Sequence, residues 1–188
     1  LLLSGSNPLS APTSILGGAL RIGSGDSLAA SAVSVLAGGT FALAPKLEAS
    51  VAGLAPLAGG LTDVGDGRLT ISAGLSATDL ASAIAAGMGD GSWTGTQGIT
   101  SSAVADAVGQ SVLRSVGWLD NGDGSMTVAY AAPGDTNLDW FVDVLDAANF
   151  VAGGLYNGGQ AATWAEGDFN YDTLVDVLDA ANFVSAGL

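Results

Sequence analysis

The chain has 188 residues, a formal net charge of −14 at pH 7, 29 glycines and only 12% charged residues. It contains no cysteine and no histidine, which excludes disulfides, cysteine or histidine zinc sites, cysteine nucleophiles and histidine-based catalytic triads. All four basic residues lie at or before position 114, so residues 115–188 carry 11 acids and no base. Such a surface repels nucleic acids and anionic membranes and attracts divalent cations.

The first nine residues, LLLSGSNPL, begin with three leucines, but the stretch is short and lacks a basic flank. We therefore expect neither a signal peptide nor a membrane span there. Because the chain begins on Leu1 rather than on methionine, we expect it to be a mature or partial piece of a longer precursor.

Glycine-rich units of similar pattern fill residues 1–75. ALRIGSGDSL, VSVLAGGTFAL and LTDVGDGRLTISAG each join an apolar alternation, typical of short strands, to a glycine turn. Small residues at the turns favour stacked rungs, as in a β-solenoid whose neighbouring strands cover one another's edges. The irregular spacing leaves a sandwich as the alternative. We predict a fold that is mainly β with α, with this region at its N-terminal side.

Two helices and a hairpin are expected in residues 76–133. The segment SATDLASAIAAGM begins with Ser76 as a cap, Asp79 completes a capping box, and Gly87 suits the end of the helix. A second helix is predicted over about 101–114. The sequences SVGWLD and SMTVAYAA, separated by NGDG, predict a β-hairpin.

The clearest domain boundary lies at AAPG, residues 131–134, where the basic residues have ended and an acidic repeat begins. We therefore divide the chain into a β-repeat region at 1–75, a segment of helices and hairpin at 76–133, and a third domain at 134–188.

The third domain contains one acidic pattern twice. DTNLDWFVDVLDAANFV starts at Asp135, and DFNYDTLVDVLDAANFV starts 33 positions later, at Asp168 (135 to 168). Counted from the first aspartate, side-chain oxygens fall at positions 1, 3, 5, 9 and 12, and position 7 offers a backbone carbonyl, as in an EF-hand calcium loop. The predicted metal ligands are Asp135, Asn137, Asp139, Phe141, Asp143 and Asp146 in the first loop, and Asp168, Asn170, Asp172, Leu174, Asp176 and Asp179 in the second.

This pattern predicts two bound calcium ions as cofactors. Each loop gathers four carboxylates within a short stretch of chain, and a hard cation with oxygen ligands would relieve their repulsion. The alternative is that these acids only cap helices and form turns, but two copies in the same register favour calcium. The pattern departs from the EF-hand at position 6, where glycine is normal and this chain has Trp140 and Thr173.

The motif G-D-x-N-x-D-x-x-V-D-x-x-D occurs from Gly134 and again from Gly167, and one predicted helix follows each copy. This pair of loop–helix units, over residues 134–188, resembles the type I dockerin repeat. The resemblance implies a small all-α, EF-hand-like domain that acts as an extracellular, calcium-dependent module. It also implies a cohesin-like domain as the partner.

The same resemblance implies recognition residues at loop positions 10 and 11. These are Val144 and Leu145 in the first copy, and Val177 and Leu178 in the second. An identical apolar pair in both copies would give a symmetric, hydrophobic docking face. The alternative is that these four side chains belong to the intramolecular core.

A longer pattern, GDGSWTGTQGITSS followed by RSVGWLDNGDGSMTVAYAAPGDTNLDW and ATWAEGDFNYD, resembles the end of bacterial exported surface proteins with autotransporter-like glycine-rich repeats. That family often carries a PEP-type C-terminal sorting signal, and no such tail is visible in this sequence. The resemblance implies an extracellular or cell-surface location.

We therefore expect a non-enzymatic structural protein of a surface or matrix, with two structural calcium sites. Its partner is expected to be another protein or further copies of itself in a homo-oligomer or filament, because rungs with exposed ends can stack. The first alternative is a dockerin-type module that attaches the chain to a cohesin-like partner. No nucleic acid and no membrane span are expected.

A less favoured alternative is a carbohydrate-active β-solenoid enzyme, which requires an acid pair on one rung face. Asp63 and Asp66 are better explained as turn residues, and DNGDG at 120–124 as a hairpin turn without later calcium ligands. Three tryptophans could stack on sugars, but anchoring the core is the favoured role. They are Trp93, Trp118 and Trp164.

Overall fold

The structure is a computed structural model that describes residues 1–5, 9–56 and 58–186. Residues 187 and 188, at the end of the second predicted loop–helix unit, lie outside the described residues. The strands are β1 (Leu2–Leu3), β2 (Thr13–Ile15), β3 (Gly18–Ile22), β4 (Ala32–Val35), β5 (Gly39–Leu43), β6 (Glu48–Val51), β7 (Gly53–Ala55), β8 (Leu61–Asp63), β9 (Arg68–Ile71), β10 (Gly98–Thr100), β11 (Ser115–Asp120) and β12 (Met126–Ala131). The helices are α1 (Ala77–Met88), α2 (Ser102–Gly109), α3 (Val144–Ala152) and α4 (Val177–Ser185), with a 3₁₀ turn η1 (Trp164–Glu166).

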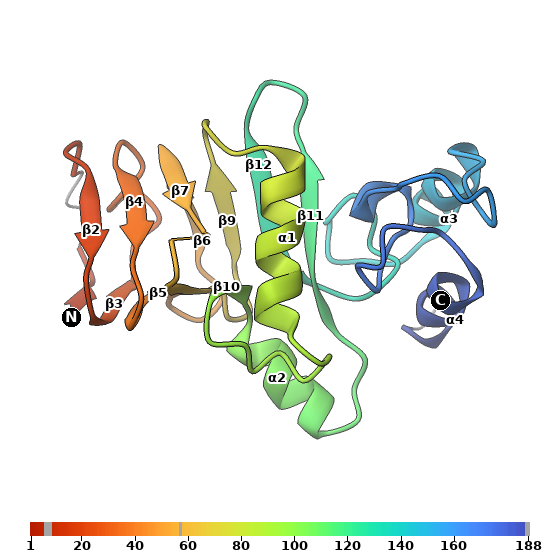
Figure 1. Ribbon diagram of the computed structural model, residues 1–188, viewed down its shortest axis with the longest axis horizontal. Coiled ribbons are helices and arrows are strands. Elements are labelled where there is room, and N and C mark those ends of the chain that lie inside the picture. Colours follow the sequence, from red (N-terminus) through yellow and green to blue (C-terminus); the bar gives the residue numbers. More distant parts are fainter. Residues whose placement is uncertain (6–8, 57, 187–188) are drawn as a thin grey trace.

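The short strands wind into a β-solenoid-like fold (Figure 1). Two sheets, β1-β3-β5-β8-β10 and β2-β4-β7, consist of parallel pairs. The third, β11-β12-β9-β6, combines a parallel pair with an antiparallel hairpin. Gly18 pairs with Gly39, and Thr40 pairs with Leu61, so one rung takes 21 residues (18 to 39 and 40 to 61). The predicted stacked rungs are present, and the sandwich alternative is wrong.

Apolar side chains fill the interior and stack from one rung to the next. Leu20 pairs with Phe41 and Ile22 pairs with Leu43, and none of these four side chains is more than 7% exposed. Because side chains alternate between the faces of a strand, the intervening Arg21 is exposed to solvent. Each rung therefore covers the apolar interior of its neighbour, and burying each large side chain contributes about 1.5–3 kcal/mol.

Helix α1 packs on β10, the last strand of the first sheet. The predicted cap is confirmed, since Ser76 Oγ accepts the Asp79 N–H at 3.1 Å. Gly87 does not end the helix as predicted, because it is needed where α1 crosses the chain: a Cβ there would collide with the backbone oxygen of Ile99. The helix ends instead at Gly89, whose φ is 61°.

The hairpin joins the solenoid as an extension of its third sheet. Strands β11 and β12 pair antiparallel as predicted, and β12 also pairs with β9. This pairing joins residues on both sides of the proposed boundary at 75, while the domain division itself stays a prediction. Helix α2 ends at Gly109, short of the predicted 114, and Ser111 has a left-handed φ of 60°.

The predicted small all-α, EF-hand-like pair at 134–188 is wrong. One helix follows each loop, but no helix precedes either: β12 and a turn lead into the first loop, and η1 leads into the second. The sequence explains the difference, because Pro133 and Gly134 (φ 108°) precede one loop and Gly167 (φ 114°) precedes the other. These residues end helices rather than extend them.

The loops of 134–188 pack against β11, at the end of the solenoid (Figure 1). At Gly117, a Cβ would lie 2.6 Å from Cδ2 of Leu138 and 2.7 Å from Cε2 of Trp164. The Tyr171 hydroxyl donates to the carbonyl of Val116. The unit is therefore attached to the strand through close packing that leaves no room for a side chain at position 117.

We predict that Gly117→Ala lowers the free energy of unfolding by about 1–3 kcal/mol, because it overpacks this junction. Urea unfolding followed by circular dichroism measures the change. Gly109→Ala is the matched control, since a Cβ at Gly109 meets no atom within 4 Å. Equal stability of the two variants would contradict the close packing at β11.

Candidate calcium-binding loops

The first acidic loop folds around the carboxylate of Asp135, which is 1% exposed. Its Oδ1 accepts the N–H of Asp139 at 3.0 Å, and its Oδ2 accepts the N–H of Trp140 at 3.0 Å. The Asp139 N–H also reaches Oδ1 of Asn137 at 2.9 Å. Oδ1 of Asp139 accepts the N–H of Phe141 at 3.0 Å. Side chains at positions 1, 3 and 5 thus hold the backbone in one tight curve.

The second loop repeats these contacts except one: no hydrogen bond corresponds to that between the Asp139 N–H and Oδ1 of Asp135. Oδ2 of Asp168 accepts the N–H of Thr173 at 3.1 Å, the position equivalent to Trp140. Asn170 Oδ1 accepts the Asp172 N–H at 2.8 Å, and Asp172 Oδ1 accepts the Leu174 N–H at 2.9 Å. The duplication in the sequence is therefore a duplication of local structure.

The acids at position 12 close each loop from the helix side. Asp146 is fully buried, and its Oδ1 and Oδ2 accept the N–H groups of Thr136 and Asp143, each at 2.8 Å. Asp179 is also fully buried and accepts the Phe169 N–H at 2.9 Å. Capping boxes are present at the start of both α3 and α4. The last two acids of each loop therefore cap the following helix, and capping leaves their remaining lone pairs free for a cation.

The backbone at position 6 is left-handed in both loops. Trp140 has a φ of 80° and Thr173 a φ of 75°, where the EF-hand pattern has glycine. Position 4 is left-handed too, with 56° at Leu138 and 64° at Tyr171. A side chain in this region costs about 1–2 kcal/mol, so the loops keep their curve against the local preference of these residues.

Burial of the first carboxylate in each loop is electrostatically unfavourable. Desolvation raises the pKa of Asp135 to about 6, and the nearby carboxylate of Asp146 adds to the effect. Desolvation likewise raises the pKa of Asp168 to about 6, with Asp179 adding to it. Oδ1 of Asp168 is buried and has no hydrogen-bond partner among the described residues. An orphaned, negatively charged oxygen beside a second carboxylate fits the donor set of a hard cation.

The other predicted ligands lie nearer the surface. Asp139, Asp143 and Asp172 are exposed, and Asn137 is half-buried. Within the described part of the chain, no three histidine, cysteine or acidic side chains are gathered into a group that could hold a metal ion. Asparagine and a backbone carbonyl supply the other two of the six predicted ligand positions in each loop. Calcium binding therefore requires the exposed carboxylates to converge on the buried ones.

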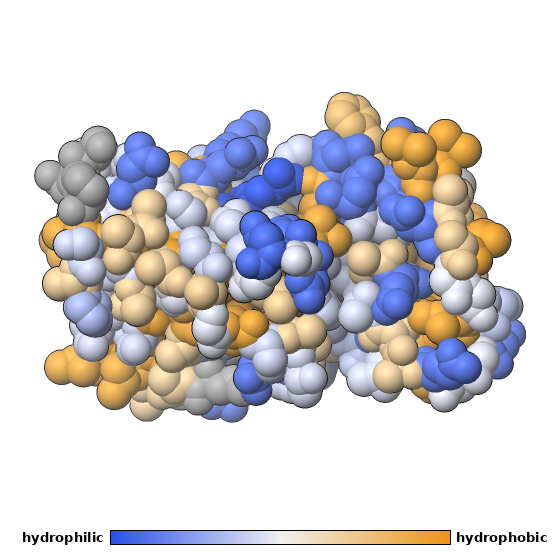
Figure 2. Space-filling view, turned by 90° about the horizontal axis from the view of Figure 1, so that it is seen from above, coloured by the Kyte–Doolittle hydropathy of each residue, from blue (hydrophilic) through white to orange (hydrophobic). Residues whose placement is uncertain are grey.

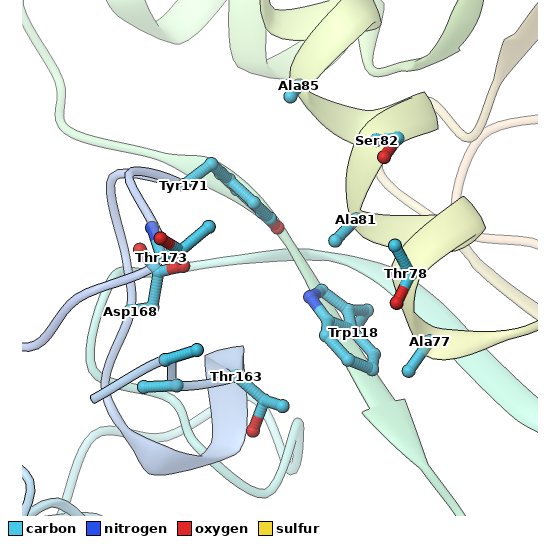
Figure 3. Close-up of a pocket in the computed structure, with 12 residues that line it drawn as sticks. Ala77, Thr78, Ala81, Ser82, Ala85, Trp118, Thr163, Asp168, Tyr171 and Thr173 are labelled. Atoms are coloured by element: carbon cyan, nitrogen blue, oxygen red, sulfur yellow. Dashed lines mark hydrogen bonds between the residues drawn. The ribbon is translucent and has the colours of Figure 1, made fainter.

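A hollow of about 360 Å³ separates the second loop from α1 (Figure 3). Alanines of the helix form one wall, and Asp168 and Thr173 lie on the opposite side. Figure 3 shows Tyr171 reaching from the loop towards Trp118 of β11. No sequence pattern indicates that Tyr171 and Leu138 hold the loops against β11, because both contacts depend on a strand that is distant in the chain.

The apolar pairs at positions 10 and 11 are on the surface. Exposed fractions are 76% for Val144, 59% for Leu145, 62% for Val177 and 57% for Leu178, so the intramolecular-core alternative is wrong. Figure 2 shows hydrophobic residues gathered at the end of the molecule that 134–188 forms.

The remaining candidates have structural roles. Trp93, Trp118 and Trp164 are at most 5% exposed, which confirms that they anchor the core. Asp63 Oδ1 accepts the N–H of Gly65 at 2.9 Å, and Asp66 Oδ1 accepts the N–H of Lys46 at 2.7 Å, as expected for turn acids. At 120–124, side-chain contacts close the hairpin turn.

Comparison with known protein families, curated proteins and solved structures finds no match to this chain. In the described ranges, the helices are all too short or too polar to cross a membrane.

We predict that the calcium-free protein loses stability as pH rises. The unfolded pKa of an aspartate is about 3.9, so with folded pKa values of about 6 the folded state binds more protons between these values. The free energy of unfolding therefore falls as pH rises through about 4–6. Thermal unfolding at pH 5 and pH 7.5 in calcium-free buffer measures this. The double variant Asp135→Asn and Asp168→Asn should flatten the dependence, and a wild-type midpoint that is higher at pH 7.5 would contradict it.

Proposed function

We propose that this chain is a non-enzymatic structural protein of a surface or matrix, in which two calcium ions stabilise the unit that covers one end of a β-solenoid. One observation carries the proposal: two duplicated loops bury their first and last carboxylates within a segment, 115–188, that has no basic residue. Nothing in that segment neutralises them, and a divalent cation would.

The first calcium would be held by Asp135, Asn137, Asp139, the Phe141 carbonyl, Asp143 and Asp146. The second would be held by Asp168, Asn170, Asp172, the Leu174 carbonyl, Asp176 and Asp179. The unpartnered Oδ1 of Asp168 supports this assignment most directly. Bound calcium would supply the positive charge that these buried oxygens lack.

Contacts between the loops and the solenoid strands β9 and β11 support a role in stabilising the solenoid. The guanidinium of Arg68, on β9, donates a hydrogen bond to the carbonyl of Leu138, which is at position 4 of the first loop. Tyr171, at position 4 of the second, donates to Val116. Trp164 is fully buried, and its indole N–H donates to the Asp135 carbonyl at 2.8 Å. Ions that order the loops would therefore also strengthen the attachment to the solenoid.

An extracellular or cell-surface location belongs to the proposal and rests on the sequence resemblance. Fibres formed by end-to-end stacking are not part of it, because α1 and residues 134–188 cover one end of the solenoid (Figure 1).

A second candidate function is attachment to a protein partner such as a cohesin-like domain. The exposure of the identical pairs Val144–Leu145 and Val177–Leu178 favours it, since two related helices present the same apolar surface. Binding that a chelator abolishes would distinguish this function from a purely structural one.

We predict that the protein binds two calcium ions and gains thermal stability from them. Calorimetric titration measures the stoichiometry, and at a free concentration of 100 Kd each site adds about 2.7 kcal/mol to the free energy of unfolding. The double variant Asp139→Asn and Asp172→Asn should lose most of both effects, because asparagine keeps the backbone-accepting oxygen but removes the charge.

The matched control is Asp106→Asn, an exposed acid on α2 outside the loops. It should bind and respond to calcium as the wild type does. The proposal fails if the wild type shows no binding heat and its unfolding temperature is the same in calcium and in chelator.

A further inference from the structure

The surface beside the first loop contains a second hollow, of about 380 Å³, where the loop meets the solenoid. Its volume lies within the range of small-ligand pockets. Five residues from separate parts of the chain line it: Lys46, Glu48, Asp66, Tyr130 and Trp140. Adjacent rungs contribute the charged residues, β12 contributes the tyrosine, and the candidate calcium loop contributes the tryptophan.

Trp140 is the unusual member of this group. Its side chain is 44% exposed, unlike the three buried tryptophans, and its backbone is left-handed. The guanidinium of Arg68 lies 5.2 Å from the centre of the ring, and the backbone N–H is fixed on Asp135. A strained, half-exposed aromatic residue held in place from two sides is the kind of outlier that points to a function.

The charges around the hollow exclude strongly charged ligands. Lys46 and Arg68 oppose a cation, while Glu48, Asp66 and the net charge of −14 oppose an anion. The polar groups include both donors, the lysine ammonium and the Tyr130 hydroxyl, and carboxylate acceptors. A neutral ligand whose hydroxyl groups donate and accept, and which has an apolar face for the indole, matches this set.

We propose that this hollow binds a neutral pyranose unit of an oligosaccharide. The Trp140 ring stacks on the C–H face of the sugar. The Glu48 and Asp66 carboxylates accept hydrogen bonds from sugar hydroxyl groups, and the Lys46 ammonium donates to sugar oxygens. The site is a binding site without a catalytic step. It rests on the proposed function only in that an ordered first loop holds Trp140 in place.

The test is a titration of the calcium-loaded protein with maltohexaose and cellohexaose, followed by tryptophan fluorescence and by the indole N–H resonances. At least one of the two hexasaccharides is expected to bind with a Kd on the order of 1 mM and to shift one indole resonance. Trp140→Gly should weaken binding at least about tenfold, a loss of about 1.4 kcal/mol. Because glycine suits this backbone, that variant should fold and bind calcium at least as well as the wild type.

Two further comparisons decide the result. Tyr156→Ala removes another aromatic residue of similar exposure, 45%, outside the hollow, and should bind the sugars as the wild type does. Glu48→Gln should weaken binding while calcium binding stays unchanged. The inference is overturned if neither hexasaccharide binds the calcium-loaded wild type, if Trp140→Gly binds equally well, or if tetragalacturonate or a chitosan oligomer binds more tightly. Calcium stoichiometry, measured separately, shows whether the proposed function also fails.

Discussion

A stack of rungs leaves an uncovered apolar interior at its last rung, and the C-terminal half of this chain is arranged around that constraint. Every rung is covered by the next until β10, where no further rung follows. Leu80 and Ile84 of α1 are fully buried there, and the hairpin continues the third sheet beyond β9. The end of a solenoid that is not covered exposes both its core and its strand edges.

This covering brings acidic groups into the interior. The loops that reach β11 carry Leu138 and Tyr171 at the centre of a sequence whose first and last acids are buried with them. Apolar packing at Gly117 favours the arrangement, while desolvation of Asp135 and Asp168 opposes it, as their raised pKa values show. Calcium is the proposed means by which the two requirements become compatible. The same arrangement explains why the segment is not a free-standing EF-hand-like domain, since its aromatic core is completed by a solenoid strand.

Features that depend on neighbours in sequence could be predicted. The strand–turn units, the cap at Ser76, the hairpin and the repeated loops all carry local patterns of spacing or turn chemistry. Features that depend on distant neighbours could not. A glycine such as Gly87 is typical of a helix end. It lies inside the helix here because the backbone oxygen of Ile99 leaves no room for a side chain at that point. Nothing near Gly117 in sequence indicates that Leu138 and Trp164 will pack on it.

Trp140 shows how the two kinds of information combine. Its position in the loop marks it as a departure from glycine, and sequence alone can treat that only as a cost to calcium binding. The structure adds what the ring contacts: Arg68 from β9, and a hollow shared with Lys46 and Glu48 of the neighbouring rung. Thr173 occupies the same position in the second loop with nearly the same φ, but it faces α1 across a hollow lined mostly by alanine and threonine. The loops are equivalent in their acids and different at position 6. The acids therefore account for the cation binding proposed for both loops, whereas position 6 adapts each loop to the part of the solenoid that it meets.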